Sequence, residues 1–148
     1  MSLKEKLVED MKIAMRARDV VKLSTIRLAR SAIKNDEINK GRELSDEDVI
    51  AILSTEAKKR KESIEAAERG GRSDIADKER TELEILQQYL PEQIGEAELE
   101  EIVRGIITEV GATSARDKGR VMSTLMQRIR GRVDGRTANE LVNRLLPT

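Results

Sequence analysis

The sequence has no histidine, cysteine, phenylalanine or tryptophan, and its only aromatic residue is Tyr89. Without histidine, the commonest general base, the commonest metal ligand and the serine triads are excluded. Without cysteine, disulfide frameworks, zinc–thiolate sites and thiol nucleophiles are excluded as well. We therefore expect a binding protein that has no catalytic residues, no cofactor and no metal.

Glycine-rich phosphate loops and long apolar runs are also missing. A phosphate-binding Walker loop fails, because Arg116 stands where the second glycine would follow Gly111, and Lys118 precedes Gly119. The chain starts with a charged amphipathic pattern rather than a signal sequence, and no stretch approaches about 18 apolar residues. These absences predict a cytoplasmic protein that does not bind a membrane.

Helical periodicity covers nearly the whole chain, and no run alternates apolar and polar residues long enough for a strand. We expect seven helices and an all-α fold, a four-helix N-terminal bundle followed by a three-helix C-terminal bundle. Pro91 forbids a smooth helix beyond it and sets the domain boundary, giving domains 1–90 and 91–148.

Helix-start and helix-stop signals predict the individual elements. In the N-terminal domain, helices are expected to begin after Ser2, at about Val20, at Ser45 and at Ser73. Ile13, Met15 and Ile75 are expected to face the interior. In the C-terminal domain, Ile94 is expected to pack on Leu99, Ser114 and Asp134 open the next two helices, and mid-helix Gly105 indicates a close helix crossing.

Charge is abundant but balanced, since 28 Lys and Arg residues face 28 Asp and Glu residues. A net charge of zero argues against a general polyanion binder. The densest basic run, residues 58–61, alternates at helical spacing with acidic residues such as Glu56 and Glu62, so a solvated helix is favoured there over a nucleic-acid site. Glu96 and Glu100 could share a helix face as a catalytic acid and base or as a magnesium clamp, but acidic residues in a first turn ordinarily complement the helix dipole.

The C-terminal part separates its charge along the sequence. Residues 92–109 hold six acidic residues and one basic residue, whereas residues 111–148 hold eight basic and three acidic residues. Seven of those eight are arginines, whose planar donor fork matches phosphate or carboxylate oxygens. This choice of residue favours anion recognition.

Four arginines and two glycines crowd into residues 128–136, which we call the basic corner. The corner joins one helix end to the next helix start, where free backbone N–H groups bind anions and glycine allows close approach. Two alternatives to anion binding stay open, because Asp134 can occupy the anion position as an N-cap and cations at a helix C-terminus also favour the dipole. Tyr89 is expected to be a hinge contact rather than a base-stacking platform.

Three stretches carry a resemblance to a known family: residues 84–93 (EILQQYLPEQ), residues 119–122 (GRVM) and residues 130–136 (RGRVDGR). They resemble the YqeY-like family (GatB/YqeY domain) over essentially the whole chain. That family is similar to the C-terminal tail of the B subunit of the aspartyl/glutamyl-tRNA amidotransferase. The resemblance implies a four-helix bundle followed by a three-helix bundle, and a tail that touches the body of the tRNA.

The resemblance also implies a stand-alone tRNA-binding accessory module as the function. Its partners would be tRNA and a tRNA-modifying or aminoacylating enzyme. An alternative is a protein-interaction adaptor that docks through residues 96–109 or 45–69. A carbon–nitrogen ligase with glutamine as amido donor follows from the family name alone, because nothing in the chain resembles the catalytic parts. The RNA-binding candidates are Lys118, Gly119, Arg120, Arg128, Arg130, Gly131, Arg132, Asp134, Gly135 and Arg136.

Overall fold

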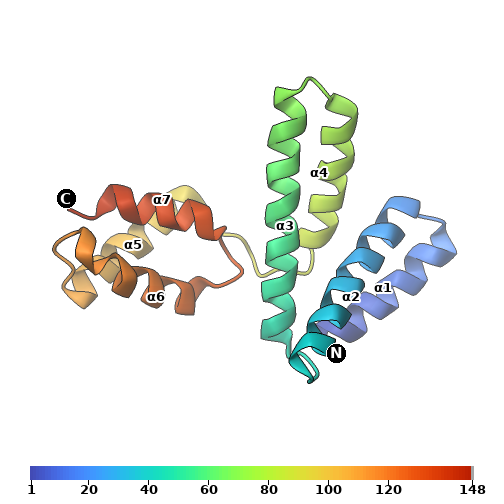
Figure 1. Cartoon of the computed structure of the whole chain (residues 1–148), viewed down its shortest axis with the longest axis horizontal. Coiled ribbons are helices and arrows are strands. Elements are labelled where there is room, and N and C mark those ends of the chain that lie inside the picture. Colours follow the sequence, from blue (N-terminus) through green and yellow to red (C-terminus); the bar gives the residue numbers. More distant parts are fainter. Residues whose placement is uncertain (148) are drawn as a thin grey trace. The chain divides into compact units, whose positions relative to one another are not determined.

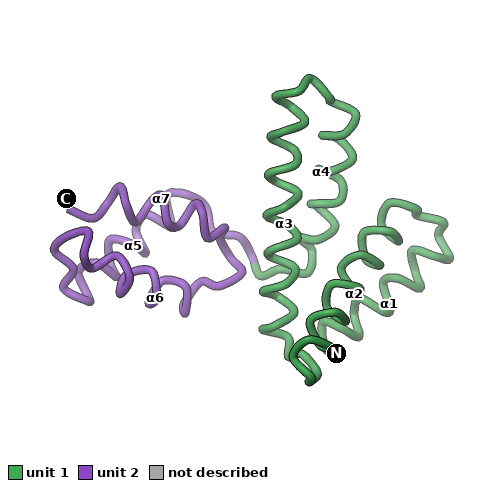
Figure 2. The backbone as a smooth tube through the Cα atoms, in the orientation of Figure 1, with its two compact units in different colours: residues 1–91 green, residues 92–148 purple. Residues whose placement is uncertain are grey.

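The computed structural model describes residues 1–147. The chain divides into two compact units, residues 1–91 (unit 1) and 92–148 (unit 2), which Figure 2 shows in separate colours. All regular structure in the described residues is helical, which confirms the all-α class. The division falls one residue after the boundary that Pro91 predicted.

Unit 1 consists of two helical hairpins (Figure 1). Their helices are α1 (Leu3–Ala17), α2 (Val20–Lys40), α3 (Asp46–Arg69) and α4 (Ser73–Gln87). Helix α2 packs on α1, α3 and α4, and the longest pairing is that of α3 along α4. The shared core is aliphatic apart from Tyr89, and it includes Leu7, Ile26, Leu53 and Leu86.

Side-chain caps explain where three of these helices begin. The Ser2 hydroxyl accepts the Glu5 N–H, and the Asp19 carboxylate accepts the Lys22 N–H. At α3, Ser45 and Asp48 cap each other's backbone N–H in a capping box. Hydrogen bonds from the Arg42 guanidinium and from Ser45 lower the pKa of Asp48 to about 2.

The structure corrects four expectations in unit 1. Ile13 and Met15 are 47% and 50% exposed, because Ala14 holds the buried position seven residues after Leu7. Ile75 is 39% exposed, and Ala76 takes the buried position. Ser73 is the first residue of α4 rather than its cap, and Arg72 precedes the helix without a side-chain cap.

Tyr89 belongs to the core of unit 1 and is 5% exposed. Its hydroxyl donates to Asp10 Oδ2 at 2.5 Å, and the Lys6 ammonium lies 5.5 Å from the centre of its ring. Burial raises the pKa of the Tyr89 phenol above its ordinary value, and the Asp10 carboxylate adds to the increase. The ring is therefore a structural contact and offers no surface on which a base could stack.

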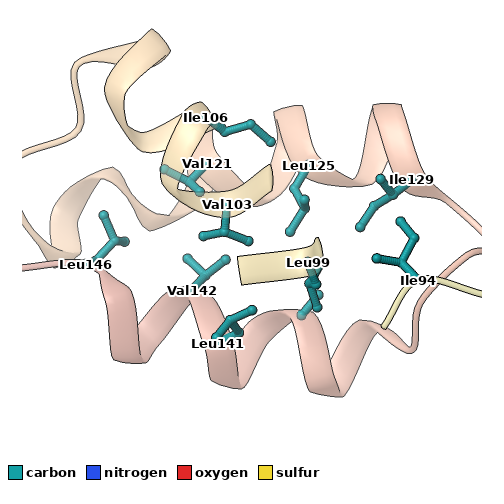
Figure 3. Packing of buried hydrophobic residues seen from close by; sticks show 11 residues of the cluster. Ile94, Leu99, Val103, Ile106, Val121, Leu125, Ile129, Leu141, Val142 and Leu146 are labelled. Atoms are coloured by element: carbon teal, nitrogen blue, oxygen red, sulfur yellow. The ribbon is translucent and has the colours of Figure 1, made fainter. Parts of the chain in front are cut away.

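Unit 2 contains α5 (Glu96–Val110), a short 3-10 turn (Ala115–Asp117), α6 (Lys118–Ile129) and α7 (Gly135–Leu145). Figure 3 shows its core, where residues of all three α-helices meet. Ile94 and Leu99 lie in this same cluster, as predicted. Ser114 and Asp117 form a capping box, although the turn they open is 3-10 before it becomes α6.

Gly105 does not mark a close helix crossing, contrary to expectation. A Cβ atom placed there would meet nothing within 4 Å, and the residue is exposed. Its neighbours Val103 and Ile106 carry the packing instead. Among residues 1–147, no helix is long and apolar enough to span a membrane.

Candidate nucleic-acid interface

The basic corner extends over the end of α6, a connecting loop and the start of α7. Arg128 lies in the last turn of α6, Arg130 follows the helix, and Arg136 is the second residue of α7. Gly131 has a backbone φ of +83°, in the left-handed region that glycine adopts without strain. The predicted corner residues are therefore close in the fold, because they follow one another along the chain.

The N-terminus of α7 already holds an anion of its own. Asp134 is the N-cap, and its Oδ1 accepts the Arg136 backbone N–H at 3.2 Å. This capping role is one of the two alternatives to anion binding, and it accounts for the aspartate without a ligand. An external phosphate would have to compete with the Asp134 carboxylate for this helix end.

Three hydrogen bonds tie the corner loop to the first residues of unit 2. Gln93 Nε2 donates to the Gly131 carbonyl at 2.8 Å, and the Ile94 N–H donates to the Arg132 carbonyl at 2.8 Å. In return, Arg132 Nε donates to the Glu92 carbonyl at 3.1 Å. We call this set of bonds the clasp. It gives Gly131 and Arg132 a structural role and gives a physical reason for the two sequence motifs to occur together.

Most of the other arginines in unit 2 face a carboxylate. Arg128 lies 2.7 Å from Glu109, Arg120 2.8 Å from Asp117, and Arg136 3.3 Å from Glu140. Arg144 approaches Glu96 at 3.9 Å and Glu100 at 3.8 Å, and Arg104 lies 2.8 Å from Glu100. These are exposed pairs of small individual energy, but they offset charge locally.

The pKa values of the paired carboxylates reflect this arrangement. The Arg128 guanidinium lowers the pKa of Glu109, and Arg104, with a smaller effect from Arg144, lowers that of Glu100. For Asp117, the Thr113 backbone N–H is the main cause of the lowered pKa and Arg120 the second. These carboxylates therefore stay charged, and their arginines stay neutralised, down to acidic pH.

The separation of charge seen in the sequence of unit 2 is largely cancelled in the fold. Helix α5, which carries the acidic stretch, supplies the partners of Arg128 and Arg144. Residues 92–148 as a whole contain nine basic and nine acidic residues. The corner therefore presents much less positive charge than its sequence suggests.

Three basic side chains of unit 2 have no ion-pair or hydrogen-bond partner among the described residues, namely Arg116, Lys118 and Arg130. Arg116 and Arg130 are exposed, and Lys118 is half-buried. Because α6 has 12 residues, its ends lie about 18 Å apart. The structure thus separates Lys118, Gly119 and Arg120, in the first turn of α6, from the basic corner at its other end.

The two helical glycines among the candidates have no packing role. A Cβ atom at Gly119 or at Gly135 would meet nothing within 4 Å. Both residues lie in the first turn of their helices. Gly119 is exposed and Gly135 is half-buried, and neither position requires glycine for a steric reason.

The most enclosed charged cluster belongs to the fold of unit 1. Arg60 lies 3.0 Å from Glu56, 3.3 Å from Glu82 and 3.8 Å from Glu79, and its side chain is 12% exposed. The spacing of Glu56 and Arg60 was predicted from the sequence, but the two partners on α4 were not. The cluster joins α3 to α4.

Within residues 1–147 there is no group of three or more side chains suited to hold a metal ion.

Several curated proteins are similar to this chain, among them the following three. A protein of Lachancea thermotolerans named "Altered inheritance of mitochondria protein 41, mitochondrial" is 36% identical over 107 residues, which cover 70% of this chain and 57% of that protein. Its namesake in Pyrenophora tritici-repentis is 32% identical over 131 residues, 86% of this chain and 71% of that protein. The namesake in Vanderwaltozyma polyspora is 40% identical over 85 residues, 57% of this chain and 46% of that protein.

The chain thus spans little more than half of the Lachancea protein and less than half of the Vanderwaltozyma protein. Those names describe mitochondrial proteins, so the cytoplasmic location expected from the sequence stays a prediction. The family model described as "Yqey-like protein" matches residues 4–146. The match extends over both units and includes every residue of the clasp. The chain belongs to the Yqey-like protein family.

Proposed function

We propose that this chain is an accessory module that binds tRNA and catalyses no reaction of its own. The observation that carries the proposal is the set of unpaired cations at the two ends of α6. Arg116 and Lys118 lie at its start, Arg130 lies at its end, and none of them has a carboxylate partner among the described residues. Such side chains are available for phosphate oxygens. The resemblance to an amidotransferase tail selects tRNA from among polyanions.

The remaining corner residues are assigned supporting roles in this proposal. Arg132 and Gly131 hold the clasp, and Asp134 caps α7. Arg128 and Arg136 would reach phosphates only by leaving Glu109 and Glu140. Exposed pairs of this kind are worth about 1 kcal/mol or less, so an incoming phosphate can replace the carboxylate.

Fluorescence anisotropy with labelled tRNA at low salt tests the proposal. We expect saturable binding that weakens steeply as salt is added, because released counterions drive phosphate contacts. The variant Arg116→Glu, Lys118→Glu, Arg130→Glu is expected to bind several-fold more weakly than the unchanged chain. No detectable tRNA binding at low salt would overturn the proposal.

Ammonia release from glutamine separates this proposal from a carbon–nitrogen ligase. The chain has no histidine or cysteine to serve as base or nucleophile, so we expect no release by the purified protein. Release that grows in proportion to enzyme concentration would contradict the non-catalytic assignment.

A further inference from the structure

Unit 1 carries a concentration of positive charge that the fold does not neutralise. Residues 11–35 contain seven basic residues and one acidic residue, whereas the rest of unit 1 contains 12 basic and 18 acidic residues. The seven are Lys12, Arg16, Arg18, Lys22, Arg27, Arg30 and Lys34. Unit 1 has no net charge, so the excess positive charge of this segment is balanced by excess negative charge in the rest of the unit.

None of these seven residues takes part in an ion pair within the described part of the chain. The ion pairs of unit 1 are made by other cations, namely Lys4, Lys40, Arg42, Lys59, Arg60, Arg72 and Arg80. The only acidic residue of the segment, Asp19, is engaged as the N-cap of α2 and accepts the Lys22 N–H at 3.1 Å. Lys34 lies near enough to Glu37 to help lower the pKa of that carboxylate, and the positive charge of the other six cations is available to a ligand.

Five of these cations are exposed side chains of the α1–α2 hairpin, and we call them the hairpin cations. On α2, Arg27, Arg30 and Lys34 are spaced by three and four residues and so form one row. On α1, Arg16 Nε donates to the backbone carbonyl of Lys12, one helical turn earlier, at 3.4 Å. All five are exposed.

The α2 row borders the groove between the two helices. The Arg30 guanidinium reaches across to Met11 Sδ on α1 at 3.2 Å. Arg30 and Lys34 also line a groove of about 140 Å³ together with Lys4, Leu7, Val8, Ile33 and Glu37. Arg27, Arg30 and Lys34 thus lie along one side of a single helix, whereas the free cations of unit 2 lie at the two ends of α6.

We propose that the hairpin cations bind the phosphodiester backbone of a folded RNA. Three of the five are arginines, which match phosphate oxygens as bidentate donors. The described surface has no exposed aromatic ring on which bases could stack, so the contacts are to the backbone and independent of base sequence. This surface goes beyond the site of the proposed function, and only the choice of RNA over DNA rests on that function.

The chemistry of the face fits an anionic membrane less well. The main apolar stripes of α1 and α2 are buried in the core of unit 1 and cannot enter a bilayer. The exposed aliphatic residues Ile13 and Met15 are two positions apart on α1, whereas Val20 and Ile38 lie on α2 at helical spacing from Arg27 and Lys34. The test below therefore includes anionic vesicles as a competing ligand.

Matched charge reversals in unit 1 test the inference. The hairpin variant is Arg27→Glu, Arg30→Glu, Lys34→Glu, and the control is Lys59→Glu, Arg69→Glu, Lys78→Glu, which makes the same charge change on exposed residues of α3 and α4. Anisotropy with tRNA and with a short RNA duplex should show at least a tenfold loss for the hairpin variant and less than a threefold loss for the control. The glutamine version of the hairpin variant, checked for folding by circular dichroism, should lower the slope of log K against log salt by about 2 to 3.

Each other outcome overturns a stated part of the inference. Equal losses of RNA affinity for the hairpin and control variants would show that the hairpin cations are not a specific RNA-binding surface. If only the variant at Arg116, Lys118 and Arg130 weakens binding, the hairpin inference fails and the proposed function stands. If the unchanged chain binds no RNA, both fail. Hairpin-dependent binding of duplex DNA alone, of polyglutamate or of anionic vesicles in place of RNA overturns the assignment to RNA.

Discussion

Two stretches of this chain have nearly the same excess of positive charge but differ in what the fold does with it. Residues 11–35 have an excess of six, and residues 111–148 have an excess of five. The acidic helix α5 packs beside the second stretch and supplies partners for Arg128 and Arg144, whereas no carboxylate of the described residues forms an ion pair with the first. A charge excess in the sequence therefore becomes a charged surface only where no oppositely charged element packs alongside.

Removing the carboxylates of α5 would free the arginines of residues 111–148 from their acidic partners, so that this stretch would resemble residues 11–35 in its available positive charge. The variant Glu96→Gln, Glu100→Gln, Glu109→Gln frees Arg104, Arg128 and Arg144. We expect RNA affinity at low salt to rise about tenfold, as additional cations displace counterions from phosphates. Anisotropy measures the change, and Glu62→Gln, Glu65→Gln, Glu84→Gln, on α3 and α4, is the control of equal charge. Equal gains for both variants would show that only net charge matters.

Single alanine substitutions should separate a binding arginine from a structural one. Arg30→Ala removes a hairpin cation and is expected to weaken RNA binding about threefold while leaving the melting temperature unchanged. Arg132→Ala removes the clasp bond to the Glu92 carbonyl and should cost about 1 kcal/mol of stability with affinity unchanged within twofold. Thermal unfolding and anisotropy on both variants check the prediction. The opposite pattern would make Arg132 an RNA contact.

Two glycines of unit 2 sharpen the distinction between structure and binding. Gly131→Ala forces a side chain into the left-handed region and should destabilise unit 2 by about 1–2 kcal/mol. Gly105→Ala fills open space in a helix interior and should stabilise it by about 1 kcal/mol. Denaturant unfolding gives both values. A destabilising Gly105→Ala would mean that this face of α5 is covered by something.

The smallest expected effect is that of pH near neutrality. With no histidine in the chain, RNA affinity should change less than twofold between pH 6 and 8. The lowered pKa values of Glu100, Glu109 and Asp117 keep these carboxylates charged, and their arginines paired, at neutral pH and on into the acidic range. Their contribution to stability is lost only as the pH falls through those lowered values. Anisotropy between pH 6 and 8 measures the RNA affinity. An affinity that followed a single titration near pH 6.5 would contradict the account.

Local signals were sufficient to predict most of the fold from the sequence. Ser45 with Asp48, and Asp134 at α7, mark helix starts through hydrogen bonds within a few residues, and Gly111 ends α5 in the left-handed conformation. The errors at Ile13, Met15 and Ile75 arose where small residues, Ala14 and Ala76, hold the buried positions. Hydrophobicity alone favours the larger neighbour, and only the packing decides.

The candidate site was less predictable because its determinants are not local. Arg128 meets Glu109 across 19 positions, and Arg132 meets Glu92 across 40. No sequence pattern indicated these partners. The charge of residues 11–35 could have been counted from the sequence, but the dense arginines and glycines of the corner drew our prediction to the other unit. That the first stretch stays unpaired is known only from the fold.

A titration of the amide resonances with a short RNA duplex tests the central claim most directly, because it reports on both stretches in one sample. The account predicts that the largest chemical-shift changes fall between Lys12 and Lys34, with smaller changes near Arg116 and Arg130 and none in the clasp. Changes confined to residues 128–136, with the α1–α2 hairpin silent, would contradict it.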